Sequence, residues 1–158
     1  MPKNNTDNKP SSDHQRVLLS RLDKIIAKTR LSQSSSNIPA SAEYLTTLGL
    51  KLETLFVVNK IYRDGGLTAK KLAGMLNTNT TYLSFLINTS YQSSIPQYII
   101  NYRIAEAKNL LSDPEFNKLT IEGLGALCGC NSKSSFNRAF LAEVGMTPQE
   151  YKNFKQQL

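Results

Sequence analysis

Residues 119–140 read LTIEGLGALCGCNSKSSFNRAF, and this stretch predicts two short helices joined by a tight turn. Thr120 occupies a position where its hydroxyl can cap the first helix by accepting a hydrogen bond from a free backbone N–H group. Gly129 follows that helix at a place suited to a left-handed backbone conformation. Asn131 or Ser132 is then available to cap the second helix. The stretch therefore predicts a helix-turn-helix unit.

The second helix of this unit has two chemically different faces. Phe136, Ala139 and Phe140 have the i, i+3, i+4 spacing of a buried stripe. The opposite face carries small polar and basic side chains. A short helix with one apolar edge and one polar, basic edge suits insertion into the major groove of a duplex, where side chains can reach base edges.

The same pattern occurs earlier in the chain, where residues 67–87 read LTAKKLAGMLNTNTTYLSFLI. This copy matches 119–140 at an offset of 52 residues before the turn and 53 after it, so the second copy has one extra residue. The match extends to 94–98 and 147–151, each of which begins with a helix cap and has Pro in the first turn, where its missing N–H is tolerated. An internal repeat of about 32 residues favours two helix-turn-helix units.

The repeated pattern resembles the C-terminal DNA-binding domain of AraC/XylS-type bacterial transcription regulators. The resemblance covers about residues 66–154, and its most specific parts are RIAEAKNLL at 103–111, SSFNRAF at 134–140 and GMTPQEY at 145–151. It implies two helix-turn-helix units joined by one long helix. It also implies that each unit places a recognition helix in successive major-groove segments of double-stranded DNA.

These observations predict an all-α fold with two helix-turn-helix subdomains, at about 67–89 and 119–143, joined by a linker helix at about 95–111. A helix of that length spans roughly 25 Å, which suits recognition helices about one DNA turn, ~34 Å, apart. The DNA-binding domain is expected to occupy residues 41–158. It begins with an extra amphipathic helix that runs from Ser41 to about Tyr62.

Residues 1–40 are predicted to form a flexible basic tail with a candidate amphipathic helix at 14–31 and a Ser-rich linker at 32–40. Three roles are open for the helix. It could dock on the domain or mediate self-association, or it could lie along phosphates or an anionic membrane surface. It could also be unfolded alone, because an isolated helix of this length is marginally stable.

The candidate DNA contacts lie on the outward faces of the recognition helices, expected at about 80–89 and 132–143, and the resemblance makes these positions groove-facing. They are Thr81, Ser84, Phe85 and Asn88 in the first unit, and Ser132, Lys133, Ser134, Asn137 and Arg138 in the second. Arg138 is the best candidate for a guanine, because its planar fork can donate two hydrogen bonds to O6 and N7. Asn137 suits an adenine or a phosphate, and the Ser and Thr hydroxyls suit phosphates.

The two units differ in charge. Phe85 aligns with Arg138, where relatives usually carry a basic residue, and residues 72–102 contain no Lys or Arg. Cys130 and residues 141–142 likewise stand where relatives usually have an aromatic residue and two basic ones. Three interpretations of the first unit follow: it reads thymine methyl groups through Phe85, it reads no base, or it presents Phe85 to a protein partner.

The composition narrows the class of protein. The net charge of +7 and the pI near 9.5 favour an anionic partner. Cys128 and Cys130 are the two cysteines of the sequence, and no cluster of His accompanies them. No metal site, disulfide or cofactor is therefore predicted. No apolar run approaches the ~20 residues of a membrane span, and we expect a cytoplasmic protein. A single His and no nucleophile–base set argue against an enzyme.

Two functions follow from the sequence. The first is a sequence-specific transcription regulator that binds duplex DNA. The alternative is a degenerate helix-turn-helix protein that acts as a protein-interaction module through Phe85 and the helix at 14–31. RNA polymerase or another regulator is a candidate protein partner, and the helix at 14–31 is a candidate for self-association.

Overall fold

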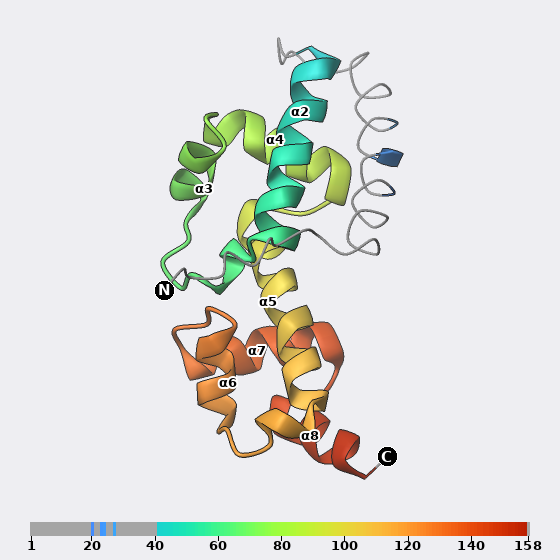
Figure 1. Ribbon diagram of the computed structural model, residues 1–158, viewed down its shortest axis with the longest axis vertical. Helices are drawn as coiled ribbons and strands as arrows, with labels where there is room; N and C mark the ends of the chain where they lie inside the picture. Colours follow the sequence, from blue (N-terminus) through green and yellow to red (C-terminus); the bar gives the residue numbers. More distant parts are fainter. Residues whose placement is uncertain (1–19, 21–22, 25–26, 28–40, 158) are drawn as a thin grey trace, which may run out of the picture. The chain divides into compact units, whose positions relative to one another are not determined.

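The computed structural model describes residues 20, 23–24, 27 and 41–157. This part of the chain contains helices and turns but no strand, which confirms the predicted all-α fold (Figure 1). It falls into two compact units that meet in the sequence between Asn59 and Lys60. The predicted tail at 1–40 and its helix at 14–31 lie outside the described residues, except for four helical positions.

The first unit contains helix α2 (Ala42–Glu53), which continues as one wider π-helical turn, η1 (Thr54–Val58). Ser41 caps α2, because its hydroxyl accepts a hydrogen bond from Tyr44 N at 3.1 Å. The buried apolar residues follow a helical spacing and are Leu45, Leu48, Leu52 and Phe56. The amphipathic helix is therefore present, but it ends before the predicted Tyr62.

The second unit contains two copies of one helix pair, α3 with α4 and α6 with α7. Its elements in chain order are η2 (Ile61–Arg63), α3 (Ala69–Met75), α4 (Thr80–Tyr91), α5 (Ile95–Ser112), η3 (Pro114–Phe116), α6 (Ile121–Leu127), α7 (Lys133–Val144) and α8 (Pro148–Gln156). Helices α3 and α6 have 7 residues each, and α4 and α7 have 12 each. The two predicted helix-turn-helix subdomains are therefore present, with α5 between them in the sequence.

The turns of the two pairs follow the same path with one difference in length. Four residues join α3 to α4, and five join α6 to α7. Asn77 and Gly129 occupy equivalent places in these turns and are both left-handed, with φ of 53° and 87°. Gln92 and Gly145, which end α4 and α7, are also left-handed, with φ of 52° and 81°. The first pair thus carries side chains where the second has glycine.

Each α helix of the second unit begins at a Ser, Thr or Asn whose side chain accepts a backbone hydrogen bond. These N-caps are Thr68, Asn79, Ser94, Thr120, Ser132 and Thr147. Thr147 and Glu150 complete a capping box, in which Thr147 N donates to Glu150 Oε2 at 2.7 Å. One such cap contributes ~1 kcal/mol, so the positions at which the helices begin are largely encoded by local sequence.

The core of the second helix pair is shared with the second half of α5. It comprises Ile104, Ala107, Leu111, Leu124, Cys128, Cys130, Phe136 and Phe140. The rings of Phe136 and Phe140 meet edge to face at 5.8 Å, and Phe140 meets Tyr151 of α8 at 5.6 Å. Burial raises the pKa of the Cys128 thiol to about 12, with a smaller contribution from Cys130. Both cysteines are free, buried thiols.

Candidate nucleic-acid interface

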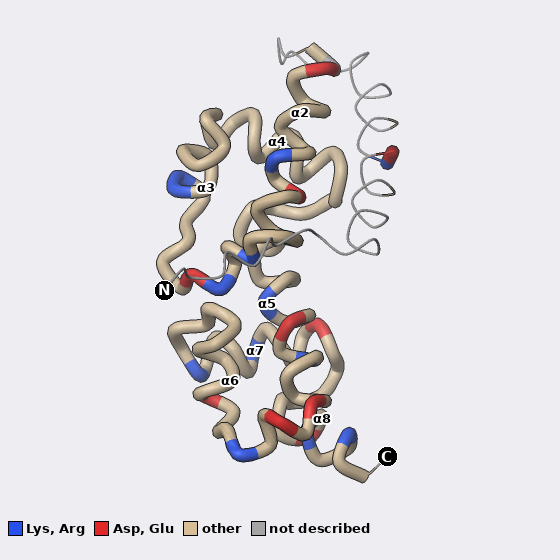
Figure 2. The backbone as a smooth tube through the Cα atoms, viewed as in Figure 1, with Lys and Arg blue, Asp and Glu red and all other residues tan. Residues whose placement is uncertain are grey.

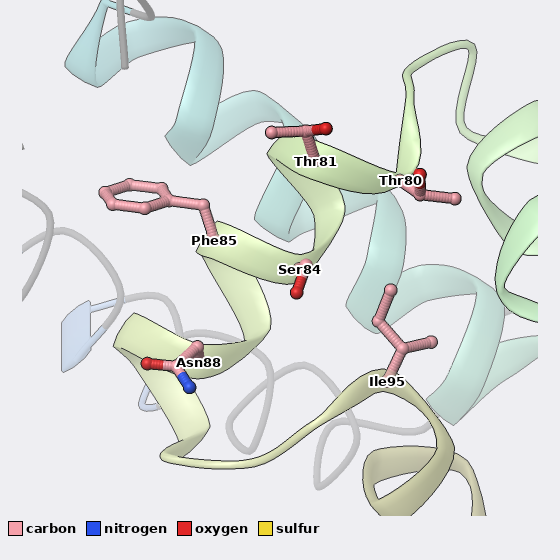
Figure 3. Close-up of a pocket in the computed structure, with 6 residues that line it drawn as sticks. All are labelled: Thr80, Thr81, Ser84, Phe85, Asn88 and Ile95. Atoms are coloured by element: carbon pink, nitrogen blue, oxygen red, sulfur yellow. The ribbon is translucent and has the colours of Figure 1, made fainter. Parts of the chain in front are cut away.

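The predicted contact residues of α4 lie together along one shallow groove. Its lining consists of Thr80, Thr81, Ser84, Phe85, Asn88 and Ile95 (Figure 3). Asn79 fixes the start of this helix, since its Oδ1 accepts a hydrogen bond from Tyr82 N at 2.9 Å. The structure therefore brings all four predicted residues of the first helix pair to one surface and adds Thr80 and Ile95, which the sequence had not singled out.

The groove on α4 is bordered by apolar and hydroxyl groups. The Phe85 ring projects from the side of the groove opposite Ile95, and Ser84 lies between them (Figure 3). Phe85 is partly buried, whereas Thr81, Ser84 and Asn88 are exposed. Ile95 reaches this surface because it is the first residue of α5, which the turn after α4 brings back beside it. The proximity of the two helix ends was not evident from helical spacing alone.

The predicted residues of α7 and its N-cap lie at three different positions on the second helix pair. Lys133 and Asn137 line one groove together with residues that begin α6 and α8, among them Thr120 and Thr147. Ser132 lines a different groove on the other side of the α7 N-terminus. Ser134 and Arg138 belong to neither lining and are exposed, so they lie on the outermost part of the helix. Helix α7 therefore forms a ridge between two grooves.

Asn137 differs from the other predicted contacts of the second helix pair, because it is partly buried whereas they are exposed. Its Oδ1 atom is covered and has no hydrogen-bond partner among the described residues. A bidentate contact with adenine uses both the oxygen and the nitrogen of an Asn amide. Such a contact would therefore require the Asn137 side chain to rotate out of this position.

The charge of the two surfaces differs as the sequence predicted. Helix α4 has no Lys or Arg, whereas α7 carries Lys133 as its first residue and Arg138 five residues later. Figure 2 shows the positions of Lys and Arg along the backbone in blue. Both basic side chains are exposed. Phosphate contacts by Lys and Arg dominate the affinity of proteins for DNA. The surface of α7 is therefore chemically suited to an anionic duplex, and that of α4 offers hydroxyls, an amide and one aromatic ring.

Other kinds of site are not apparent in this part of the chain. The described residues contain no group of three or more His, Cys, Asp or Glu side chains placed to hold a metal ion. Among the described helices, none combines the length and apolar character that crossing a membrane requires.

Comparison with known proteins places this repeat in a family. Residues 72–153 match a helix-turn-helix domain family. The chain is 33% identical over 94 residues to the melibiose operon regulatory protein of Escherichia coli K12, and 27% identical over 100 residues to YdiP of the same strain, an uncharacterized HTH-type transcriptional regulator. These matches cover 60% and 63% of this chain but only 30% and 32% of the two relatives.

Two solved structures share the fold. A DNA-binding transcriptional dual regulator from Escherichia coli K-12 has a TM-score of 0.57 and 23% identity, covering 78% of this chain and all of that one. A protein of unknown function from Listeria innocua has a TM-score of 0.54 and 24% identity, covering 64% of this chain and 92% of that one. Because the family match covers more than half of the sequence, the chain belongs to the AraC-type helix-turn-helix family.

Proposed function

We propose that this protein is a sequence-specific, DNA-binding transcription regulator whose second helix-turn-helix unit supplies the main base-reading and phosphate contacts. Membership of the AraC-type family supports DNA binding and favours it over the alternative of a protein-interaction module. The observation that carries the proposal is the ridge of α7. It presents two exposed basic groups on a capped helix whose other face is anchored in a shared core.

Arg138 is assigned the role of base reader in this proposal. Its side chain is exposed on the outermost part of α7. Phe136 and Phe140, its neighbours on the buried face, are 1% and 0% exposed, so the helix cannot roll without losing core contacts. A guanidinium on a fixed helix can donate two hydrogen bonds to guanine O6 and N7. Lys133 and Ser134, nearer the start of the helix, are assigned to phosphates.

The other predicted residues contribute less to base reading in this proposal. Asn137 is assigned to a phosphate through its NH₂ group. Its Oδ1 atom is buried, so it is not accessible for the second hydrogen bond of an adenine pair. Ser132 caps α7 by accepting from Ser135 N at 3.4 Å, so its hydroxyl is already engaged in the helix end. Thr81, Ser84 and Asn88 of α4 are assigned to phosphates, and Phe85 to apolar contact with a thymine methyl group.

The test begins with selection of bound fragments from a random DNA pool by the purified protein. On the selected site we expect Arg138→Ala to lose about 5- to 150-fold in discrimination at one base pair, the value of one bidentate contact. The matched variant Phe85→Ala, at the equivalent place in the first helix pair, should lose less discrimination. Binding that is equal for all sequences, and unchanged by Arg138→Ala, would contradict the proposed function.

A further inference from the structure

The segment that leads into the first helix-turn-helix pair also contacts the second pair. This segment comprises residues 60–66, here called the latch segment, and includes the short helix η2. It lies within the second compact unit, just before the Thr68 cap of α3. Its backbone and side chains make specific contacts with three different elements: α5, α3 and the turn between α6 and α7.

Helix α5 holds the latch segment at two residues one turn apart. Arg103 donates from Nε to Tyr62 O at 2.8 Å and from Nη2 to Asp64 O at 2.9 Å. Glu106 accepts from Tyr62 Oη at 3.0 Å and forms an ion pair with Arg63, and Lys60 Nζ lies 3.5 Å from its Oε2. Burial opposes ionisation of Glu106, but the hydrogen bonds from Arg63 and Tyr62 outweigh it, and its pKa lies below the ordinary value.

The turn of the second pair packs directly on the latch segment. A Cβ atom at Gly129 would lie 2.4 Å from Tyr62 O, so only a glycine allows this approach. Two residues later, Asn131 donates from Nδ2 to Gly65 O at 2.9 Å. Asn131 immediately precedes Ser132, the cap of α7. The start of the second recognition helix is therefore bonded to the backbone of the latch segment.

The first pair is attached to the same segment. Asp64 accepts from Gly66 N at 2.8 Å through Oδ1 and forms an ion pair with Lys71 of α3 through Oδ2. Leu67, which follows the latch segment, is buried. One short stretch thus has polar contacts with the first pair, with α5 and with the start of α7.

From these contacts we infer that the latch segment positions α7 relative to α4, and thereby determines which spacing between two DNA half-sites the protein accepts. Helix α5 joins the two pairs through one connection. The latch segment adds a second one, which runs from α3 through the Lys71–Asp64 ion pair to the hydrogen bond between Gly65 and Asn131, and Arg103 fixes this segment on α5. A change of one base pair in spacing rotates a half-site by roughly a tenth of a turn. A protein with two fixed recognition helices discriminates against that rotation, whereas a looser one tolerates it. This inference rests on the proposed function.

The test compares affinities for a series of duplexes in which the two selected half-sites are moved by one or two base pairs. We expect the wild-type protein to prefer one spacing. Asn131→Ala and Arg103→Gln each remove hydrogen bonds to the latch segment, and each should reduce that preference by about two- to tenfold. Affinity for the second half-site alone should change less, because neither residue is assigned to DNA contact.

Gln156→Ala is the matched control. Gln156 donates from Nε2 to Asn117 Oδ1 at 3.0 Å, an exposed long-range amide bond like that of Asn131, but it connects α8 only to the segment before α6. Its loss should leave the spacing preference unchanged. Circular dichroism on all three variants checks that each is folded.

A second measurement does not depend on DNA. Spin labels on Lys70→Cys in α3 and Glu143→Cys in α7, both exposed positions, report the distance between the two pairs. We expect one narrow distance distribution in the otherwise wild-type protein and a broader one when Asn131→Ala or Arg103→Gln is added. If distances and spacing preference are unchanged in both variants, the latch inference is wrong. If the wild type selects no DNA sites but the distances broaden, the proposed function fails while the positioning role stands.

Discussion

Helices α4 and α7 have the same length and the same kind of polar cap, yet they present different chemistry to a partner. Helix α7 offers Lys133 and Arg138, whereas α4 offers hydroxyls, one amide and Phe85. The cores of the two pairs also differ, because the buried apolar side chains of the first pair are aliphatic, whereas the second pair has two phenylalanine rings packed edge to face. The backbone of a helix-turn-helix unit is thus specified by caps and apolar spacing, while its outer surface is free to diverge.

The two pairs also differ in which residues take a left-handed backbone conformation. Asn77 and Gln92 in the first pair stand where Gly129 and Gly145 stand in the second. A left-handed backbone costs a non-glycine residue of order 1–3 kcal/mol, with Asn the most tolerant. The second pair avoids this cost, and at Gly129 it also gains an approach to the latch segment that no side chain would allow.

The largest expected effect is on the turn of the second pair. We expect Gly129→Ala to lower the free energy of unfolding by about 3 kcal/mol or more, because it combines backbone strain with a clash against Tyr62 O. The equivalent change, Asn77→Ala, should cost only ~1 kcal/mol, since it adds strain alone. Chemical denaturation measures both. Equal losses would show that the added Cβ at residue 129 does not clash with Tyr62 O.

The next effect concerns pH and the link between the two pairs. Since the folded pKa of Glu106 lies below its ordinary value of 4.5, its contribution to stability is complete above that pH and is lost as pH falls through the lowered folded value. Glu106→Gln should cost ~2 kcal/mol at neutral pH, the loss of hydrogen bonds to a charged group. The variant should also lose less stability than the wild type in acid.

Asp64 and Glu150 also have lowered pKa values, Asp64 through Lys71 and Glu150 through the backbone of Thr147, and they titrate in the same region. The free energy of unfolding is therefore measured for the wild type and for Glu106→Gln from pH 7 to 3. The difference between the two at each pH isolates the contribution of Glu106. A difference that stays constant over this range would contradict its assigned role.

A smaller effect should follow from making the first pair resemble the second. Phe85→Arg places a basic group at the position equivalent to Arg138. If this surface lies against DNA, the added positive charge lies close to the phosphates, and the slope of log affinity against log salt should steepen by up to about 0.9. Fluorescence anisotropy over a salt series measures the slope. An unchanged slope would contradict the assignment of Phe85 to a thymine contact, because it would place this side chain away from the duplex.

The smallest effect is at the ends of the recognition helices. Gln92→Gly should raise the free energy of unfolding by ~0.5–1 kcal/mol, because glycine removes left-handed strain at the C-cap of α4. Gly145→Ala should lower it by about 1 kcal/mol, since no atom lies within 4 Å of the added Cβ and only strain remains. Thermal unfolding detects shifts of this size. A stabilising Gly145→Ala would mean that unfolded-state entropy outweighs the strain.

Local sequence was sufficient to predict most of the fold. Thr120 as a cap, Gly129 as a left-handed residue and one extra residue in the second turn are all present. Each depends on a few neighbouring residues, so helical spacing and capping rules can detect it. The outward position of the α4 residues followed from the same spacing, because the buried stripe fixes the opposite face.

The choice between Asn131 and Ser132 shows where local rules stop. Either residue can cap a helix, and the structure uses Ser132 for the cap and Asn131 for a bond to Gly65, which is 66 positions away in the sequence. Local rules likewise did not predict that the Asn137 Oδ1 atom is buried. They also did not predict the contacts of Glu106 with Tyr62 and Arg63.

The sequence by itself determined the helices, their caps, their repeat and the charge of each outer face, since all of these depend on residues within one or two turns of each other. Only the tertiary structure decided how the latch segment joins the two pairs and which polar groups face inward. Those contacts link residues far apart in the chain, and whether they form depends on how the packed helices bring them together, which short-range patterns do not specify.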